Sequence, residues 1–370
     1  MTVSQLTIAE ALNISVATVS RSLRNHPAIS PETRARVGEA AVRFGYKVNP
    51  AGRGRLPGSR STASTASSSD AAIKSVQGLV PLAAICRGSI NPNSVHNLVA
   101  LRLIQGMSRG ARANRASLHV EFLSSAEFDL LASAGGHPQV VRDAFVSGAL
   151  LVNQPTSAVV HSLANVMPCI NFERYSDCTT TDCVTEDNLG SMSLLFDHLL
   201  ELGHRKIGLI DSLYDQPSYT ARFAGYVQNL MERGMVYDPA NATLPDAPAD
   251  LNIRIPLLAD HVARQIRKNG VTAWICMNDY IGYQIMTQLA RHNLSAPRDL
   301  SICGFDNFEP PLGLPKLTTI DGPFEEMGLV AVTRLIQRIV QKDLPPVHMM
   351  LRTRLITGQS TGPYGGGQPA

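Results

Sequence analysis

Seven short apolar segments, each ending in a polar residue and followed by a helical pattern, dominate the sequence from residue 79 onward. They are PLAAICR (81–87), LHVEFLS (118–124), ALLVNQ (149–154), CINFER (169–174), IGLID (207–211), WICMND (274–279) and SICGFDN (301–307). Continuous apolar strands that alternate with helices are typical of parallel sheets buried on both faces. The sequence therefore predicts an α/β core of parallel sheets flanked by helices.

The polar residues at the ends of these segments form a second pattern. In parallel α/β sheets, ligands bind at the carboxyl ends of the strands. Any one of these residues is equally well explained as a strand end or a helix cap, but as a set they outline a polar cleft. The residues expected to face this cleft are Arg87, Ser124, Asn153, Glu173, Asp211, Asn278 and Asp306.

The N-terminal segment differs in charge from the rest of the chain. Residues 1–60 contain nine arginine and lysine residues against three glutamates, whereas the net charge of all 370 residues is only +3. A basic segment ahead of a mildly acidic body favours contact with a polyanion. Three helical patterns follow one another here, over residues 6–12, from Ser15 to about residue 23, and over residues 30–44. Two helices joined by a tight turn and braced by a third form a helix-turn-helix.

The second of these helices is the candidate DNA reader. Small side chains on its exposed N-terminal half let the backbone enter a major groove about 12 Å wide. Arg21 can then reach a guanine edge, while Thr18 and Ser20 can contact phosphates. A small three-helix packing module without DNA contacts is the plainer alternative. The residues at or near the exposed side are Val16, Ala17, Thr18, Ser20 and Arg21.

Residues 7–50 resemble the DNA-binding head of the lac-repressor (LacI/GalR) family of transcription regulators. The similarity runs through SVATVSRSL (15–23) and HPAISPETRARVGEAAVRFGYKVNP (26–50). It implies that Val16, Ala17 and Arg21 read bases. The hydroxyl residues Ser15, Thr18 and Ser20 are expected to contact phosphate or cap the helix. Arg24 is expected to add a further contact. The residues so assigned to DNA are Ser15, Val16, Ala17, Thr18, Ser20, Arg21 and Arg24.

The segment after the head departs from this family. The resemblance implies a hinge helix with a leucine six positions after Asn49 that enters the minor groove, but that position is Arg55. Leu56 comes one residue later, about 100° around a helix, and two nearby glycines disfavour a helix by about 1 kcal/mol each. We therefore expect Arg53, Arg55 or Leu56 to contact the minor groove or phosphates, with a disordered tether as the alternative.

The core resembles the same family over most of residues 76–362. The matching segments are EDNLG (186–190), HLLELGHRKIGLI (198–210), RFAGY (222–226), MNDYIG (277–282), LSICGFDN (300–307) and LTTIDGPFEEMG (317–328). The resemblance implies two periplasmic-binding-protein-like lobes with a small effector between them, held by Arg222, Glu173, Asn278 and Asp306. Carboxylates and amides pair with sugar hydroxyls, and an arginine fork orients them. Residues 87–145 match poorly, so the identity of the effector is not transferred.

The sequence offers little for other classes of protein. It has no apolar run of about 18 residues and no signal-peptide pattern at its start, so no membrane partner is expected. Its six scattered cysteines predict reduced, buried thiols in a cytoplasmic protein. No metal, cofactor or enzymatic activity is expected, because the corresponding motifs are missing. We expect Asp279 to cap the next helix and His204 to be a cation at a helix end.

These observations predict an all-α helix-turn-helix head (1–48), a hinge and flexible linker (49–75), a two-lobed α/β effector-binding and dimerisation core (76–362) and a disordered tail (363–370). The expected function is that of a cytoplasmic, homodimeric, sequence-specific repressor on a pseudo-palindromic operator, controlled by a sugar or sugar derivative. Two alternatives remain open. One is a DNA-binding regulator with a non-sugar effector or no effector control. The other is a solute-binding or enzymatic domain that merely includes a helix-turn-helix.

Overall fold

The chain in the computed structural model divides into two compact units, Met1–Ser68 and Ser69–Ala370, and each is considered by itself. We call them the head unit and the core unit. The structure describes residues 9, 11–12, 14–23, 29–43, 78–88, 95–153, 155–172, 181–210, 217–242, 248 and 250–364.

The head unit contains the helices α2 (Val16–Leu23) and α3 (Pro31–Arg43). The hydroxyl of Ser30 accepts the backbone N–H of Thr33 at 3.2 Å, so this serine caps α3 as the sequence predicts. Small side chains let the helices pack closely around a minimal core. The buried residues of this core are Ala9, Val19, Val37, Ala40 and Ala41.

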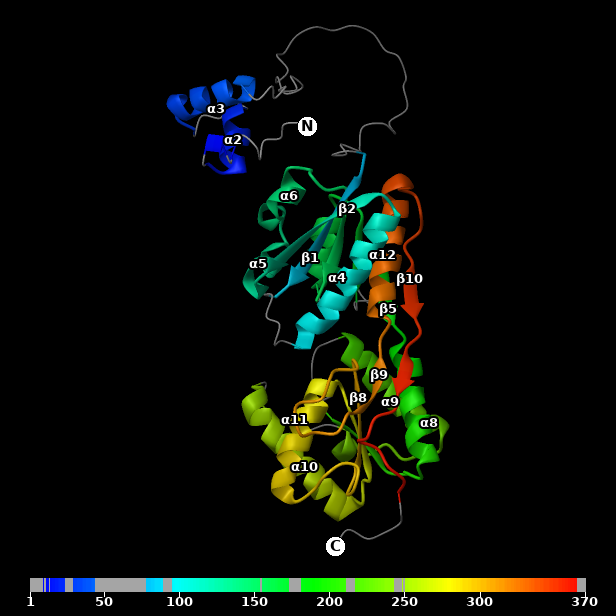
Figure 1. The fold of residues 1–370 in the computed structure, drawn as a ribbon. Coiled ribbons are helices and arrows are strands. Elements are labelled where there is room, and N and C mark those ends of the chain that lie inside the picture. The colour runs from blue at the N-terminus through cyan, green and yellow to red at the C-terminus, as the bar shows by residue number, and fades with distance from the viewer. Residues whose placement is uncertain are drawn as a thin grey trace. The chain divides into compact units, whose positions relative to one another are not determined.

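The first sheet of the core unit is parallel throughout, as predicted. Its strands are β1 (Val80–Arg87), β2 (Ala116–Leu123), β3 (Gly148–Val152), β4 (Cys169–Phe172), β5 (Asp182–Glu186) and β10 (His348–Leu351). They lie in the order β10-β5-β4-β3-β1-β2 (Figure 1). We call this sheet and the helices that cover it the first lobe.

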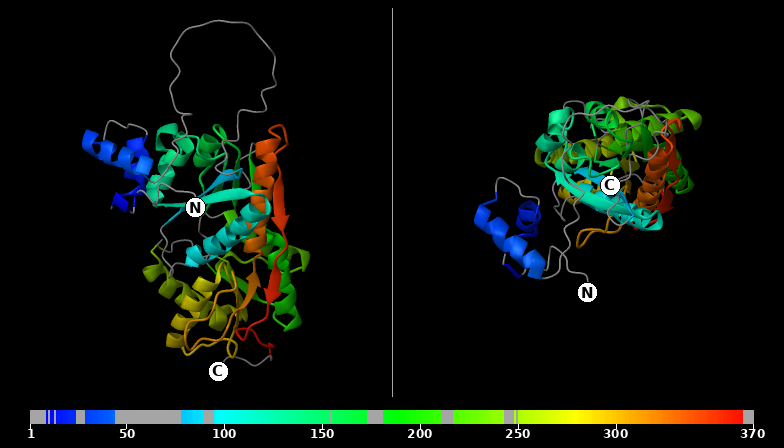
Figure 2. Two further views of the ribbon diagram at one scale, coloured as in Figure 1. Left: turned by 45° about the horizontal axis from the view of Figure 1, so that its top comes forward. Right: turned by 90° about the horizontal axis from the view of Figure 1, so that it is seen from above.

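Helices cover both faces of the first lobe's sheet. They are α4 (Val95–Ala113), α5 (Ser125–Leu130), η1 (Ala134–Gly136), α6 (Gln139–Arg142), α7 (Ser157–Ala164) and α12 (Phe324–Val340). Buried residues alternate along β1. Leu82, Ala84 and Cys86 belong to one apolar cluster with α4 and α12, and Ala83 and Ile85 to another with α5, α6 and α7. In both Figure 1 and Figure 2, α4 and α12 lie side by side.

The second lobe is built around a second sheet, of order β11-β9-β8-β7-β6, in which only β11 is antiparallel to its neighbour. Its strands are β6 (Ile207–Ile210), β7 (Ala273–Cys276), β8 (Ser301–Phe305), β9 (Thr318–Asp321) and β11 (Arg354–Ile356). Its helices are α8 (Asn188–Glu201), α9 (Pro217–Glu232), η2 (Pro239–Asn241), α10 (Leu251–Asn269), α11 (Asp279–Leu289) and η3 (Ala290–His292). Trp274 and Cys276 pack with α10 and α11, while Ala273 and Ile275 pack with α8 and α9.

The chain passes between the lobes three times, after β5, after β9 and between β10 and β11. The backbone N–H of Asp187 donates to the carbonyl of Leu351 at 2.8 Å, which joins the first and third passages. Arg354 Nη2 lies 2.7 Å from Asp321 Oδ2, which joins the third and second passages. The three connecting segments therefore hold one another in place.

Glycines allow α4 and α12 to approach backbone to backbone. A Cβ atom at Gly106 would lie 1.8 Å from the carbonyl oxygen of Glu325, and one at Gly328 would lie 2.2 Å from that of Leu103. The side chain of Arg102 crosses the same interface and donates to Glu325 at 2.8 Å. Because α12 follows directly after the second passage, this close contact fixes the passage to the first lobe.

The Gly106→Ala variant is expected to unfold about 1–3 kcal/mol more easily than the wild type, because the added methyl group must displace the α12 backbone. Urea unfolding, followed by the fluorescence of the single tryptophan, Trp274, measures this difference. Gly135→Ala is the control, since a Cβ atom there meets nothing within 4 Å. Equal free energies of unfolding for the two variants would contradict the proposed packing.

Candidate functional site

Helix α2 presents a narrow surface of small side chains and one arginine. Val16 is 40% exposed and Arg21 is exposed, whereas Val19 and Ser22 are buried on the opposite side. Val16 and Arg21 are two of the residues that the sequence predicts for DNA reading, and both lie on the solvent side. A side chain as short as that of Val16 leaves the start of the helix free to approach base edges.

Hydrogen bonds at the start of α2 assign a local role to Ser15. Its hydroxyl accepts the backbone N–H of Thr18 at 3.0 Å and lies 2.8 Å from the Thr18 hydroxyl. Ser15 is therefore the N-cap, one of the two roles expected for it. Ser20 is partly buried, and Ala17 lies within α2. The other predicted DNA contacts, Arg24, Arg53, Arg55 and Leu56, lie outside the described residues.

The predicted cleft residues of the first lobe lie at the strand ends but are engaged locally. Arg87 pairs with Asp129 at 3.1 Å, and its carbonyl accepts a hydrogen bond from Asn153 Nδ2 at 2.8 Å. Ser124 caps α5 in a reciprocal pair with Glu127. Among the described contacts, these residues form links within their own lobe. Glu173 and Asp211 lie outside the described residues.

The predicted cleft residues of the second lobe do come together, around the buried guanidinium of Arg222. Arg222 Nη1 donates to the carbonyl of Met277, and Nη2 lies 3.8 Å from Asp306 Oδ1. Asn278, next in the chain, donates from Nδ2 to the hydroxyl of Tyr219 at 2.6 Å. The Tyr219 ring centroid is 5.7 Å from the guanidinium carbon, so the four side chains form one cluster.

Sequence reasoning missed a central member of this cluster, Glu186. Its carboxylate accepts a hydrogen bond from Arg222 Nη2 at 2.5 Å, and Asn188 Oδ1 accepts one from Arg222 Nε at 2.8 Å. Glu186 is the last residue of β5, so it too is a polar residue at a strand end. The signal was present in the sequence, but the strand DCVTE (182–186) is too polar to be recognised as an apolar segment.

Asp306 has an unusual backbone and an unusual proton affinity. Its φ of 99° lies in the left-handed region, which is costly for a residue other than glycine and is often found at functional sites. Burial, opposed by Arg222 and reinforced by Glu186, raises the pKa of its carboxyl to about 7. Asp306 can therefore hold a proton near neutral pH.

The prediction that Asp279 caps the next helix is wrong. The cap of α11 is Asn278, whose Oδ1 accepts the N–H of Ile281 at 2.8 Å. Asp279 is instead fully buried, where it accepts hydrogen bonds from the Thr319 hydroxyl and the Phe308 N–H. Burial, together with nearby Asp306, raises the pKa of Asp279 well above its ordinary value.

The prediction that His204 is a cation at a helix end is also wrong. Its ring is buried, and its two nitrogens lie 2.9 Å from the hydroxyls of Thr272 and Ser301. Burial lowers the pKa of His204, so the neutral ring is favoured. It is a structural residue of the second lobe.

The cysteines of the described residues are buried, as the sequence predicts, and Cys178 lies outside this part of the chain. Burial raises the pKa of Cys86 and Cys169 to about 12, which makes these thiols unreactive. The buried cysteines are Cys86, Cys169, Cys183, Cys276 and Cys303.

A metal site and a membrane-spanning helix are both absent from the residues that the structure describes. Over the described ranges, no group of three or more His, Cys, Asp or Glu residues is placed to hold a metal ion. No described helix is both long enough and apolar enough to cross a membrane. The cluster around Arg222 combines carboxyl, amide and guanidinium groups, which are able to donate hydrogen bonds to hydroxyl groups or accept them.

A helix-turn-helix head followed by a two-lobed binding core defines a class of protein, the ligand-responsive regulators of transcription. Comparison with family models agrees with this. Residues 7–49 match the model for bacterial regulatory proteins of the lacI family, and residues 196–361 match a periplasmic binding protein-like domain. The chain belongs to the lacI family, and it is a DNA-binding transcriptional regulator, as its sequence predicts.

Individual proteins support the same assignment over nearly the whole chain. The transcriptional repressor CytR of Escherichia coli (strain K12) is 27% identical over 364 residues, 96% of this chain and 95% of that protein. A CelR–cellobiose complex has a TM-score of 0.64 at 19% identity, covering 97% of this chain and 99% of the other. A lac repressor dimer bound to operator and anti-inducer has a TM-score of 0.63 at 19% identity, covering 98% of this chain and 100% of the other. The two structures share the fold, and the repressor relative confirms the prediction of a regulator rather than an enzyme.

Replacing Arg21 by alanine is expected to weaken binding to a specific site by about 1–3 kcal/mol, because a guanidinium–guanine contact is lost. Fluorescence anisotropy at fixed salt, with DNA from upstream of the protein's own gene and a scrambled duplex, measures this. Arg36→Ala, which removes an exposed charge from α3, is the matched control and should affect both duplexes alike. If the Arg21→Ala variant also loses the same affinity for both duplexes, Arg21 does not read bases.

The Asp306→Asn variant is expected to be more stable than the wild type at pH 8 but not at pH 4.5. The folded chain holds the Asp306 proton up to about pH 7, whereas the unfolded chain releases it near pH 4, so wild-type stability falls as pH rises through this window. Each pKa unit corresponds to about 1.4 kcal/mol. Urea unfolding at several pH values tests this, and a difference that does not depend on pH would exclude a raised pKa.

Proposed function

We propose that this regulator is a homodimeric repressor whose affinity for its operator is set by a neutral sugar or sugar derivative bound between the lobes. The observation that supports this best is the buried cluster of Arg222, Asp306 and Glu186. Glu186 ends a strand of the first lobe, whereas the other two residues belong to the second lobe. A ligand that contacts this cluster touches both lobes.

The DNA-binding part of the proposal assigns the head to the operator. Two heads of a dimer would lie about 34 Å apart on a pseudo-palindrome. The division into head (1–48), hinge and linker (49–75), core (76–362) and tail (363–370) is part of this proposal. The residues proposed to contact DNA are Ser15, Val16, Ala17, Thr18, Ser20, Arg21, Arg24, Arg53, Arg55 and Leu56.

The charge of the cluster favours a neutral ligand. The guanidinium of Arg222 already faces two carboxyls, from Glu186 and Asp306, so an anionic ligand would meet more repulsion than attraction. Hydroxyl groups can donate to these carboxyls and accept from the remaining N–H groups of Arg222. Solved structures of this fold contain cellobiose, glucose or ribose. The residues proposed to line the effector site are Arg87, Ser124, Asn153, Glu173, Glu186, Arg222, Asn278 and Asp306.

Dimerisation is supported by apolar side chains that remain exposed in the single chain. They occur on α4 of the first lobe and on α10 and α11 of the second, and burying them would remove a large apolar surface from water. One of the similar solved structures is a repressor dimer on its operator. A DNA-binding regulator works where the DNA is, so we place the protein in the cytoplasm. The exposed residues are Leu98, Leu101, Ile253, Leu257 and Tyr280.

In this mechanism the effector acts by binding one arrangement of the lobes more tightly than another. Only such differential binding shifts the equilibrium and changes the affinity for DNA. The braced passages between the lobes, with α4 and α12 in close contact, favour a few discrete arrangements over continuous bending.

A regulator without effector control is the second candidate. It is favoured by the number of contacts that Arg222 already makes, with Glu186, Asn188 and Met277, which leave few N–H groups for a ligand.

The first experiment is a titration of the full-length protein with DNA from upstream of its own gene, at fixed salt, with and without a panel of neutral sugars. One sugar is expected to change DNA affinity about tenfold. The Asp306→Asn variant should need about ten times more of that sugar, since a carboxyl partner of its hydroxyls is lost. Asp197→Asn, which alters an exposed carboxylate paired with Arg233, is the control and should respond like the wild type.

The outcomes of this titration separate the candidates. Specific DNA binding without any sugar response favours the regulator without effector control. A response that Asp306→Asn leaves unchanged would move the effector site away from the Arg222 cluster. DNA binding no tighter than to a scrambled duplex would contradict the operator proposal.

A further inference from the structure

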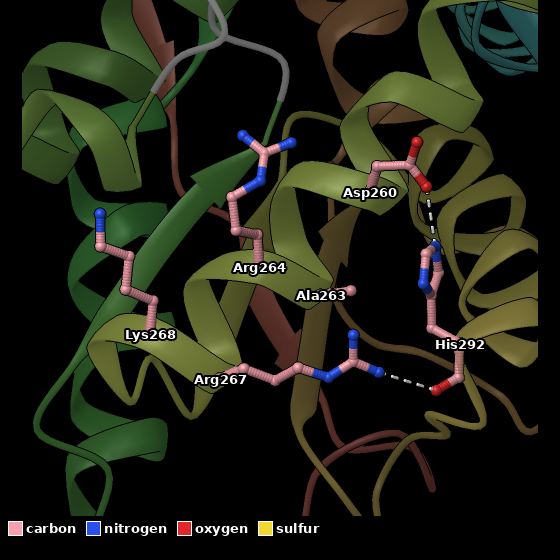
Figure 3. A pocket seen from close by; sticks show the side chains of 6 residues that line it. All are labelled: Asp260, Ala263, Arg264, Arg267, Lys268 and His292. Carbon is pink, nitrogen blue, oxygen red and sulfur yellow. Dashed lines mark hydrogen bonds and ion pairs between the residues drawn. The ribbon is translucent and has the colours of Figure 1, made fainter.

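A cavity of about 480 Å³ lies on the second lobe, beside the C-terminal half of α10 and η3 (Figure 3). The helix α10 ends at Asn269 and leads into the first residue of β7, whereas Asn278 and Asp306 follow the last residues of β7 and β8. The cavity therefore lies toward the opposite end of the sheet from the Arg222 cluster. Its lining residues are Asp260, Ala263, Arg264, Arg267, Lys268 and His292.

Positive charge in this cavity exceeds the negative charge. Asp260 is the one carboxylate of the lining, and its Oδ1 lies 2.8 Å from Nε2 of His292. Arg267 donates one N–H to the carbonyl of His292 at 3.2 Å, which leaves its other N–H groups available (Figure 3). The side chains of Arg264 and Lys268 make no ion pair or hydrogen bond with any residue that the structure describes.

Basic residues at the end of a helix often do no more than compensate the helix dipole. This explains Arg267 and Lys268, which lie in the last turn of α10, but not Arg264. The need for further positive charge at this helix end is also reduced, because Lys206 Nζ already donates to the last carbonyl of the helix, that of Asn269, at 2.8 Å. Arg264 and Lys268 are four residues apart on one side of the helix, a spacing at which like charges repel. An anion held beside both would relieve this repulsion.

We propose that this cavity binds the phosphate group of a small phosphorylated metabolite, at a site separate from the effector cleft. The guanidinium group of Arg264 can donate two N–H groups to phosphate oxygens, and Lys268 adds a point charge on the same side of the helix. Arg267, which extends toward His292, adds to the positive charge of the lining (Figure 3). The volume lies in the range of small-molecule sites. A neighbouring cavity of about 820 Å³ shares Lys268 and includes Arg205 and Lys206 in its lining, which gives space for the rest of such a molecule.

The test is calorimetric titration of the full-length protein with inorganic phosphate, glucose 6-phosphate and glucose, at constant ionic strength. Phosphate and glucose 6-phosphate are expected to bind the wild type. The double variant R264Q/K268Q should lose at least tenfold in affinity for both. R109Q/R112Q is the matched control, because it removes two exposed arginines from α4, on the other lobe, and should bind like the wild type. Thermal unfolding checks that each variant is folded.

The proposal fails if phosphate and glucose 6-phosphate do not bind the wild type, or bind the wild type and R264Q/K268Q equally. It also fails if R109Q/R112Q loses as much affinity, since the effect would then be one of net charge. Tighter binding of glucose 6-phosphate than of phosphate identifies an ester as the ligand, and the reverse identifies the free ion. Binding of an unphosphorylated acidic peptide in preference to both would replace the proposal with a protein-docking surface. No DNA or effector response enters these outcomes, so they are independent of the proposed repressor mechanism.

Discussion

The buried guanidinium of Arg222 is the group on which the arrangement of the core unit depends. Removing such a charge from water costs several kcal/mol unless its partners are close and well oriented. Here they are Glu186 at 2.5 Å, Asn188 at 2.8 Å, the Met277 carbonyl, and the ring of Phe305 with its centroid 4.0 Å away. These partners come from β5, α8, the end of β7 and the end of β8, so one side chain of α9 fixes four other elements.

The same arginine explains the behaviour of Asp306. One positive charge stands between two carboxyls, and Glu186 takes the short contact while Asp306 remains at 3.8 Å. The more distant carboxyl receives too little compensation for its burial, so it retains a proton up to about pH 7. A carboxyl that is half protonated near neutral pH can either donate or accept a hydrogen bond. This property suits a ligand made of hydroxyl groups, and it results from the chain's own charges.

Much of the fold could be predicted from the sequence, because strands buried on both faces must be apolar along their whole length. This holds for β1, β3 and β4 and for β6 to β8, each of which falls largely within a predicted segment. The edge strand β2 also falls largely within one, although it is only partly buried. The strands β5, β9, β10 and β11 were missed. Polar residues obscure β5 (DCVTE) and β9 (TTID), and all four strands adjoin the passages between the lobes, which no local pattern reveals. The errors at His204 and Asp279 have the same origin, since partners distant in sequence decided their roles.

The site could be predicted only in part, for a reason that also bears on function. A polar residue at the end of a strand can cap the next helix, bridge strands or face a ligand, and the sequence does not distinguish these roles. In the first lobe, Ser124 became a cap and Arg87 a surface ion pair, whereas in the second lobe Arg222 and Asp306 met in one cluster. The first lobe reaches that cluster through Glu186, a residue at the start of a passage between the lobes. Because this carboxylate both holds Arg222 and begins a connecting segment, a ligand that competed for Arg222 would act directly on a segment that joins the two lobes.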